Sequence, residues 1–333
     1  MYQILSSFHI DGYLESCIGG RSENQDACGF SDTPIGALVI VCDGMGGVNG
    51  GSIASSTAVK TIITFFSQAS EQDDPIELIK SAVNAANKAI LDTANSDSSL
   101  TGMGTTLVLT LINERCAYVT SIGDSRIYQL RSKRKVFRTE DDSIVFQLVK
   151  SKAITEEEAR TSDSSNIITK ALGISAKLDF DILTLPYDKY DRFLLCTDGF
   201  WGSMPEPEML DMLNKKGDLS LFFDRALRKV EKIGRKNNPN HFDNYTMAVF
   251  DVGKYSKQRS LMEKRLMILS LVLFFLLIAS MALSYSLYRN IHQSNEDSRE
   301  QISTGNATTP TDSVRATIDL PAEKAVTDTT KKL

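Results

Sequence analysis

The chain has 333 residues, of which 42% are hydrophobic and 24% charged, a composition typical of a folded protein and not of one that is disordered throughout. Its 37 Lys and Arg residues against 42 Asp and Glu give a formal charge of −5, so no basic surplus is available for nucleic-acid phosphates, which excludes nucleic acid as a general partner. Five cysteines without CxxC spacing indicate a reducing compartment and no disulfide framework.

Residues 1–253 combine helical and strand patterns. A first helix is expected along 54–65, after a glycine-rich turn. A second helix is expected after Asp74, which can cap it, with Pro75 in its first turn and apolar residues recurring on one face through Ile90. Short strand-forming runs, bounded by Gly, Asp or Asn, are expected at Ala37–Cys42, Thr105–Ile112, Ala117–Ile122, Arg126–Leu130, Asp179–Leu185, Arg192–Cys196 and Thr246–Asp251.

Three of these strands follow one another closely, at 105–112, 117–122 and 126–130. Parallel neighbours need a connection of about a dozen residues or more, so these three strands are expected to pair antiparallel. This spacing excludes a Rossmann-type or P-loop sheet in this part of the chain.

An uncharged apolar run extends from Leu266 to Leu287. At 1.5 Å per residue its roughly 22 residues form a helix of about 33 Å, enough to cross a bilayer, and a buried core helix of this length would rarely lack every charge. Five Lys and Arg residues lie between Lys254 and Arg265, so the positive-inside bias predicts a single-pass protein of the cell (inner) membrane with its N-terminal part in the cytoplasm. The polar stretch that follows is predicted to be a disordered tail outside the membrane.

Aspartates lie at the ends of the expected strands. Asp43 and Asp198 each follow an apolar strand and precede a glycine, which lets the backbone turn so that a carbonyl oxygen can join the carboxylate around an ion. Asp26, Asp124 and Asp243 occupy similar positions. One Asp-Gly pair alone is an ordinary turn signal, but several together, without Cys or His at zinc-like spacing, indicate an all-oxygen site for Mg²⁺ or Mn²⁺.

Six short motifs occur together in one order. They are R-S-E-N-Q-D at 21–26, V-C-D-G-M-G-G at 41–47, G-M-G-T-T at 102–106, G-D-S-R at 123–126, C-T-D-G at 196–199 and D-N at 243–244. As a set they resemble the metal-dependent protein serine/threonine phosphatases of the 2C class, over about residues 8–251. The segment 166–173 is also similar to one in bacterial members of that family.

The resemblance implies an α+β fold, a four-layer α-β-β-α sandwich of two antiparallel sheets flanked by helices, followed here by one transmembrane helix. It also implies hydrolysis of phosphoserine and phosphothreonine in proteins by a water that two divalent cations, Mn²⁺ or Mg²⁺, activate. The expected partners are phosphoproteins, a cognate serine/threonine kinase whose action the chain reverses in bacterial signalling, and membrane lipid around one helix. A cysteine phosphatase is not indicated, because no cysteine lies in a phosphate-cradling loop followed by Arg.

The resemblance assigns the metal ligands residue by residue. Asp43 would bridge both ions, Asp26 and the carbonyl of Gly44 would serve one ion, and Asp198 with Asp243 would hold the other. These five residues are the predicted metal site.

Further positions around that site follow from the same resemblance. Arg21 matches the family arginine that grips the substrate phosphate, where a planar fork of donors suits two oxygens. Asp124 resembles a ligand that some bacterial members use for a third, weaker ion. Met45 stands where eukaryotic members have a proposed general-acid histidine, and Gln25 stands where many relatives have Glu. His241 is an alternative acid, although a solvent-exposed loop histidine is the simpler interpretation.

The expected domains are a phosphatase catalytic domain at 1–253, a basic juxtamembrane linker at 254–265, a transmembrane helix at 266–287 and a disordered polar tail at 288–333. A variable flap beside the active site is expected at about 144–168. The alternative function is a catalytically weak pseudophosphatase acting as a membrane-tethered binding module, against which the retained carboxylates and arginine argue. A membrane sensor controlled by the tail is a second alternative, for which the tail is short and polar.

Overall fold

The computed structural model describes residues 2–7, 9–46, 50–132, 134–162, 164, 167–213, 219–238, 240–253 and 268–290. The chain divides into two compact units, Met1–Met262 and Glu263–Leu333. All the strands of the described residues lie in the first unit, and the described part of the second is a single helix.

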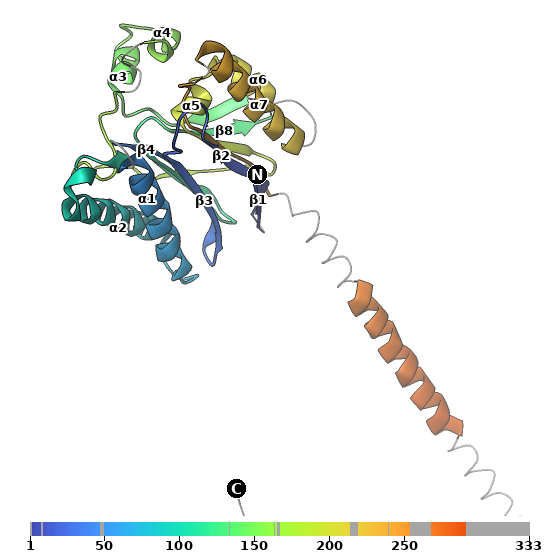
Figure 1. Ribbon diagram of the computed structural model, residues 1–333. Coiled ribbons are helices and arrows are strands. Elements are labelled where there is room, and N and C mark those ends of the chain that lie inside the picture. Colours follow the sequence, from blue (N-terminus) through green and yellow to red (C-terminus); the bar gives the residue numbers. More distant parts are fainter. Residues whose placement is uncertain are drawn as a thin grey trace, which may run out of the picture. The chain divides into compact units, whose positions relative to one another are not determined.

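Two antiparallel sheets form the centre of the first unit (Figure 1). One sheet has the order β1 (Gln3–Ser6), β2 (Ile10–Cys17), β12 (Tyr245–Val252), β11 (Arg192–Cys196), β8 (Arg126–Arg131) and β9 (Arg134–Arg138). The other has the order β10 (Leu183–Leu185), β7 (Ala117–Ile122), β6 (Leu107–Ile112), β4 (Gly36–Met45) and β3 (Asp26–Thr33), with β5 (Gly104–Thr105) paired to β4.

Helices cover the outer face of each sheet (Figure 1). The β3–β4 sheet is covered by α1 (Gly50–Ser67) and α2 (Pro75–Ser96), which leads into the short η1 (Ser98–Leu100). The other sheet is covered by α5 (Asp198–Trp201), α6 (Glu206–Leu213) and α7 (Leu219–Asn237). The short helices α3 (Ile144–Lys150) and α4 (Glu156–Arg160) lie in the predicted flap. The four-layer sandwich that the family resemblance implies is confirmed.

Strand β4 borders two of the three layers of apolar side chains that lie between the sheets and helices. Side chains alternate between the faces of a strand. The odd-numbered residues from Ala37 to Val41 are buried between the two sheets, and the even-numbered ones from Leu38 to Cys42 are buried against α1 and α2. A strand with both faces covered is therefore continuously apolar, which is why this one could be read from the sequence.

The expected helix after Asp74 is confirmed as α2. The Asp74 carboxylate accepts hydrogen bonds from the backbone N–H groups of Ile76, at 2.9 Å, and Glu77, at 3.0 Å, and Pro75 occupies the first turn. Such a cap stabilises a helix by about 1 kcal/mol. The helix along 54–65 is confirmed as α1.

The expected pairing of strand 117–122 with strand 126–130 is wrong. β7 and β6 pair antiparallel as predicted, but β8 belongs to the other sheet, where its neighbours are β9 and β11. The chain passes between the sheets at Gly123, whose φ of +98° is a backbone conformation that side-chain-bearing residues rarely adopt. A short connection excludes parallel pairing, but it does not require the two strands to share a sheet.

Other boundaries differ from the sequence expectations. Only Leu183–Leu185 of the run expected from Asp179 pairs in a sheet. Strands β1, β2, β3 and β9 were not expected, because each is half exposed and carries polar residues or glycine among its apolar ones.

The second unit contains the helix Ile268–Asn290, whose most apolar window of 18 residues has a mean hydropathy of 2.4. By length and composition this helix can cross a membrane. The predicted span 266–287 begins two positions earlier, outside the described residues, and ends three residues before this helix does. The predicted linker, 254–265, also lies outside the described residues, as does the tail from residue 291.

Candidate metal centre

At the ends of the central strands, the loops surround a cavity of about 500 Å³. Five of the six residues predicted from the sequence for metal and phosphate line it, together with Asp124. They are Arg21, Asp43, Gly44, Asp198 and Asp243. The sixth, Asp26, is buried with 8% of its surface exposed and does not line the cavity.

Asp26 and Asp43 are brought together by strand pairing. They are direct partners in the antiparallel register of β3 and β4, which places their Cβ atoms about 5 Å apart. The Asp26 carboxylate accepts hydrogen bonds on Oδ2 from the hydroxyls of Thr197, at 3.0 Å, and Thr246, at 2.7 Å. Thr246 lies in β12 of the other sheet and Thr197 directly follows β11 of that sheet, so Asp26 links the two sheets at the floor of the site.

Two threonines of the G-M-G-T-T motif hold the backbone of Asp43. The Asp43 N–H donates to the hydroxyl of Thr106 at 2.9 Å, and its carbonyl accepts from the Thr105 hydroxyl at 2.9 Å and from the Thr106 N–H at 2.8 Å. The sequence marked this motif but did not show what it does. Its threonines position the predicted bridging carboxylate.

Gly44 lies where three backbone segments meet. A Cβ atom at this position would lie 2.1 Å from the carbonyl oxygen of Gly51 and 2.5 Å from that of Gln25, distances that no side chain tolerates. Glycine therefore allows β4 to pass between the start of α1 and the loop before β3.

A similar close approach brings Asp198 beside Asp243. Asp198 is the first residue of α5, and a Cβ atom on the next residue, Gly199, would lie 1.9 Å from the carbonyl oxygen of Asn244. The start of α5 is thus pressed against the backbone that precedes β12.

Asn244 fixes the loop that carries Arg21. Its side-chain oxygen accepts from the N–H of Gln25 at 2.9 Å, and its side-chain nitrogen donates to the carbonyls of Ile18, at 2.7 Å, and Glu23, at 2.9 Å. The D-N motif was expected to supply one metal ligand. The structure adds that its asparagine organises the neighbouring loop.

The carboxyl groups of the site disfavour one another's charge. Burial, followed by repulsion from Asp26 and Asp198, raises the pKa of Asp43 well above its ordinary value. Burial raises the pKa of Asp26 to about 7, and burial with the charge of Asp243 raises the pKa of Asp198 to about 6. The pKa of Asp124 is raised by burial and then by Asp198. This concentration of buried acids is what a divalent cation would compensate.

Two buried oxygen atoms fit the same conclusion. Asp26 Oδ1 and Asp198 Oδ1 are buried and have no hydrogen-bond partner among the described residues. Leaving such an atom unpaired costs roughly 1–3 kcal/mol, and carboxylate oxygens are the ligands that Mg²⁺ and Mn²⁺ prefer. No three acidic, histidine or cysteine side chains of the described part close around one point, so each ion would need further oxygens, such as the Gly44 carbonyl.

Arg21 lies at the mouth of the cavity. Its Nη2 contacts Asp243 Oδ2 at 3.1 Å, and the two side chains are 49% and 40% exposed. An exposed pair of this kind contributes little to stability, so the guanidinium can exchange this partner for another anion at small cost.

The remaining predicted positions divide into those at the cavity and those away from it. Met45 lines the cavity, whereas His241 is exposed and is not among the lining residues.

Cys42 and Cys196 are fully buried in β4 and β11, and burial raises the pKa of both thiols. A thiolate nucleophile is therefore not available from either strand.

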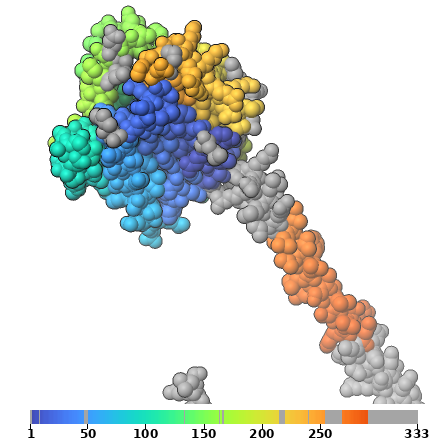
Figure 2. Space-filling view, viewed as in Figure 1, coloured from blue at the N-terminus to red at the C-terminus, as the bar shows by residue number. Residues whose placement is uncertain are grey.

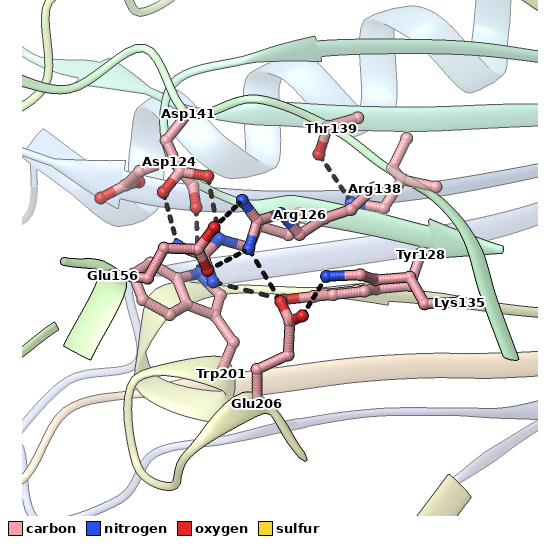
Figure 3. A network of polar contacts seen from close by, with 11 residues as sticks. Asp124, Arg126, Tyr128, Lys135, Arg138, Thr139, Asp141, Glu156, Trp201 and Glu206 are labelled. Atoms are coloured by element: carbon pink, nitrogen blue, oxygen red, sulfur yellow. Dashed lines mark hydrogen bonds and ion pairs between the residues drawn. The ribbon is translucent and has the colours of Figure 1, made fainter. Parts of the chain in front are cut away.

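A buried arginine supports the Asp124 side of the site (Figure 3). Arg126 donates two hydrogen bonds to the Asp141 carboxylate, from Nε at 2.9 Å and from Nη2 at 2.7 Å, and its guanidinium lies 3.4 Å from the centre of the Trp201 ring. The Trp201 indole N–H donates to the carbonyl of Asp124 at 3.0 Å. The G-D-S-R motif thus meets the residue two positions after the C-T-D-G motif through one stacked pair.

A second arginine joins the flap to the rest of the fold (Figure 3). Arg138 Nη1 donates to Glu156 in α4 at 2.7 Å and to Glu206 in α6 at 2.8 Å. Glu206 also pairs with Lys135 and accepts from the hydroxyl of Tyr128 at 3.2 Å. Together these contacts form an ion-pair network that joins α4 of the flap to β9 and α6.

Comparison with known protein families shows that residues 15–240 match the family described as Protein phosphatase 2C. A protein named "Serine/threonine phosphatase stp" from Listeria welshimeri serovar 6b is 33% identical over 222 residues, which cover 66% of this chain and 88% of that protein. "Protein phosphatase PhpP" from Streptococcus pneumoniae is 30% identical over 238 residues, 70% of this chain and 94% of its own length.

Solved structures match the fold as well. The serine/threonine phosphatase PstP/Ppp of Mycobacterium tuberculosis is 28% identical, with a TM-score of 0.65 over 74% of this chain and 100% of that one. A structure of the catalytic domain of PstP in complex with 2 manganese ions, also 28% identical, has a TM-score of 0.63 over 74% of this chain and 99% of that one.

Proposed function

The chain belongs to the protein phosphatase 2C family of bacterial-type serine/threonine phosphatases, which use two metal ions, and on that basis we propose which of its residues do the chemistry. In this assignment Asp43 would hold both ions, Asp26 and the carbonyl of Gly44 would serve one of them, and Asp198 with Asp243 would hold the other. The observation that carries this assignment is the pair of buried carboxylate oxygens, Asp26 Oδ1 and Asp198 Oδ1, for which the described part of the chain offers no hydrogen-bond partner.

The ions, when bound, supply an activated water for in-line attack on phosphorus and neutralise negative charge on the phosphoryl oxygens. The protein's own residues orient the substrate around them. Arg21 offers a planar fork of donors to two phosphate oxygens when it leaves Asp243. Thr105 and Thr106 hold the Asp43 backbone, so its carboxylate needs no rearrangement during the reaction.

The leaving serine or threonine oxygen must receive a proton, and the residues at the cavity limit its source. Met45 carries no proton to give, and His241 is exposed away from the lining. We assign this proton to solvent within the cavity and not to a histidine.

Substitutions on one strand test the metal assignment. In the full-length chain with Mn²⁺, Asp26→Asn should lower phosphate release from a phosphothreonine peptide by at least about a hundredfold, because it removes a charged ligand. Asp32→Asn, at an exposed position on the same strand β3, is the matched control and should retain full activity. A rate for Asp26→Asn equal to that of the control would refute the assignment.

We also propose how the enzyme is placed in the cell. The catalytic domain, 1–253, faces the cytoplasm and is joined by the basic linker 254–265 to one transmembrane helix, 266–287, with the tail 288–333 outside. The basic residues before an apolar helix of sufficient length support this orientation. Cytoplasmic phosphoproteins are then the substrates, and a serine/threonine kinase is the opposing enzyme.

A further inference from the structure

A second cavity adjoins the metal centre. It has a volume of about 300 Å³, and Asp198 and Asp243 line both it and the catalytic cavity. The two cavities therefore adjoin at these two residues. We call the second cavity the side pocket; its other lining residues are Arg160, Gly199, Trp201, Gly202, Ser203, Val230, Ile233, Gly234, Asn237 and Phe242.

Apolar side chains form much of the side pocket. Val230 and Ile233 come from α7, Trp201 ends α5, and Phe242 lies in the loop before β12. Val230 and Trp201 are buried, and Ile233 and Phe242 are half-buried against the same core. The pocket thus offers a partly apolar surface beside a site that handles a strongly charged group.

The side pocket is held open by contacts on two sides. A Cβ atom on Gly234 would lie 2.3 Å from the Phe242 ring, so this ring packs directly on the α7 backbone and fixes one wall. On the other side, Arg160 of the flap donates from Nη1 to the carbonyl of Gly202 at 3.0 Å. Figure 2 shows the green flap segment beside the yellow and orange segment of α5–α7 at this edge of the catalytic unit. The pocket therefore exists before substrate arrives.

The geometry of an extended peptide relates the two cavities. Side chains at positions i and i+2 point to the same side and lie about 7 Å apart. When the phosphorylated residue lies in the catalytic cavity, the side chain two positions away would lie beyond Asp198 and Asp243, at the side pocket. On the basis of the proposed function, we propose that the side pocket binds an aliphatic side chain two positions from the phosphoserine or phosphothreonine of a protein substrate.

The charges around the side pocket favour this occupant over an acidic one. Arg160 is forked onto Glu157 of its own helix, so its charge is already compensated. An acidic side chain would lose its hydration against the apolar walls formed by Val230, Ile233 and Phe242. A leucine-sized side chain fits the volume and gains from contact with the apolar walls.

Phosphothreonine peptides that differ at one residue test the proposal. Leu, Ala, Lys or Asp is placed two positions before or after the phosphothreonine, and kcat/KM is measured with the full-length chain in detergent and Mn²⁺. We expect about a tenfold preference for Leu over Ala at one of these two positions, the size typical of one aliphatic side chain entering a pocket. At the same position, Asp should be the poorest substrate.

Two substitutions in α7 provide the matched comparison. Asn237→Trp adds bulk at the rim of the side pocket from an exposed position, so the ratio of kcat/KM for the Leu and Ala peptides should fall to about one. Lys232→Trp adds the same bulk on the same helix outside the pocket lining, and should keep both the ratio and the rate on 4-nitrophenyl phosphate. Ile233→Ala enlarges the pocket and should shift the preference from leucine towards phenylalanine.

Equal rates for Leu and Ala at both positions, a preference for Lys, or a leucine preference that survives in Asn237→Trp would each overturn the side-pocket proposal. If the wild-type chain with Mn²⁺ hydrolysed neither 4-nitrophenyl phosphate nor any peptide, the proposed function itself would be wrong. The two failures are thus distinguishable.

Discussion

Replacing Asp198 with asparagine should stabilise the metal-free protein while it removes phosphatase activity. Burial and the charge of Asp243 raise the pKa of Asp198 from an ordinary value of 3.8 to about 6. A carboxyl group with a raised pKa holds its proton more tightly when the protein is folded than when it is unfolded. Its ionisation therefore destabilises the fold as pH rises from about 4, and the full cost is present above about pH 6.

The pKa values set the size of the effect. A shift of about two pKa units corresponds to about 3 kcal/mol, and this is a ceiling because Asp43 shares a hydrogen bond with Asp198 and takes up part of the protonation. For a domain of this size 1 kcal/mol moves Tm by about 2–4 °C, so the expected rise is several degrees.

Thermal unfolding of the full-length chain in EDTA at pH 7.5 measures the difference in Tm between Asp198→Asn and wild type. Asp198→Asn should melt several degrees above wild type, and near pH 4 the difference should vanish. Saturating Mn²⁺ should raise the Tm of wild type more than that of the variant, because only wild type keeps the full ligand set. A Tm for the variant equal to or below that of wild type in EDTA at pH 7.5 would refute the reasoning and make Asp198 a structural residue.

Three further predictions concern the phosphate, the cysteines and the membrane. Arg21→Ala should raise KM for a phosphopeptide roughly 10- to 100-fold, because it removes a charge-assisted hydrogen bond to the phosphate, and Mn²⁺ affinity in calorimetry should stay unchanged. Loss of Mn²⁺ binding would make Arg21 structural. EDTA should stop activity reversibly and iodoacetamide should not, because burial keeps Cys42 and Cys196 as thiols; the opposite pattern would indicate cysteine chemistry. Alkaline phosphatase fused after Leu333 should be active and green fluorescent protein there should be dim; a bright fusion without alkaline phosphatase activity would place the tail in the cytoplasm.

The parts of the site that could be predicted are those determined by local sequence. β4 is apolar at every position from Ala37 to Cys42 because both of its faces are covered, and Asp43 interrupts that run directly before Gly44. A charged residue at the end of such a strand is conspicuous, and the same pattern occurs at Asp198. Polar residues at strand ends therefore led to the cavity without knowledge of how the sheets pair.

What escaped prediction depends on residues that are distant in sequence. Thr197 and Thr246 donate hydrogen bonds to Asp26 across the two sheets. Thr197 lies between β11 and α5 and Thr246 lies in β12, and neither is marked by any pattern in its own segment. Arg138 and Glu206 are ordinary surface residue types whose pairing depends on how β9 packs against α6. Neither arrangement leaves a periodic pattern in the sequence.

The pairing error at Gly123 has a related cause. Short connections restrict strand direction, but whether the next strand joins the same sheet depends on the backbone at the turn and on the partners available in the other sheet. β8 pairs with β9 and β11, which lie later in the chain.

The number of Mn²⁺ ions bound per chain tests the central claim most directly. The full-length chain is exposed to a small molar excess of Mn²⁺ and released from detergent for native mass spectrometry. Wild type should then show two tightly bound ions. Asp43→Asn should lose at least one of them, because Asp43 is assigned as the ligand that both ions share. Wild type with no bound Mn²⁺, or Asp43→Asn that still binds two ions as tightly, would contradict the two-metal centre assigned to these residues.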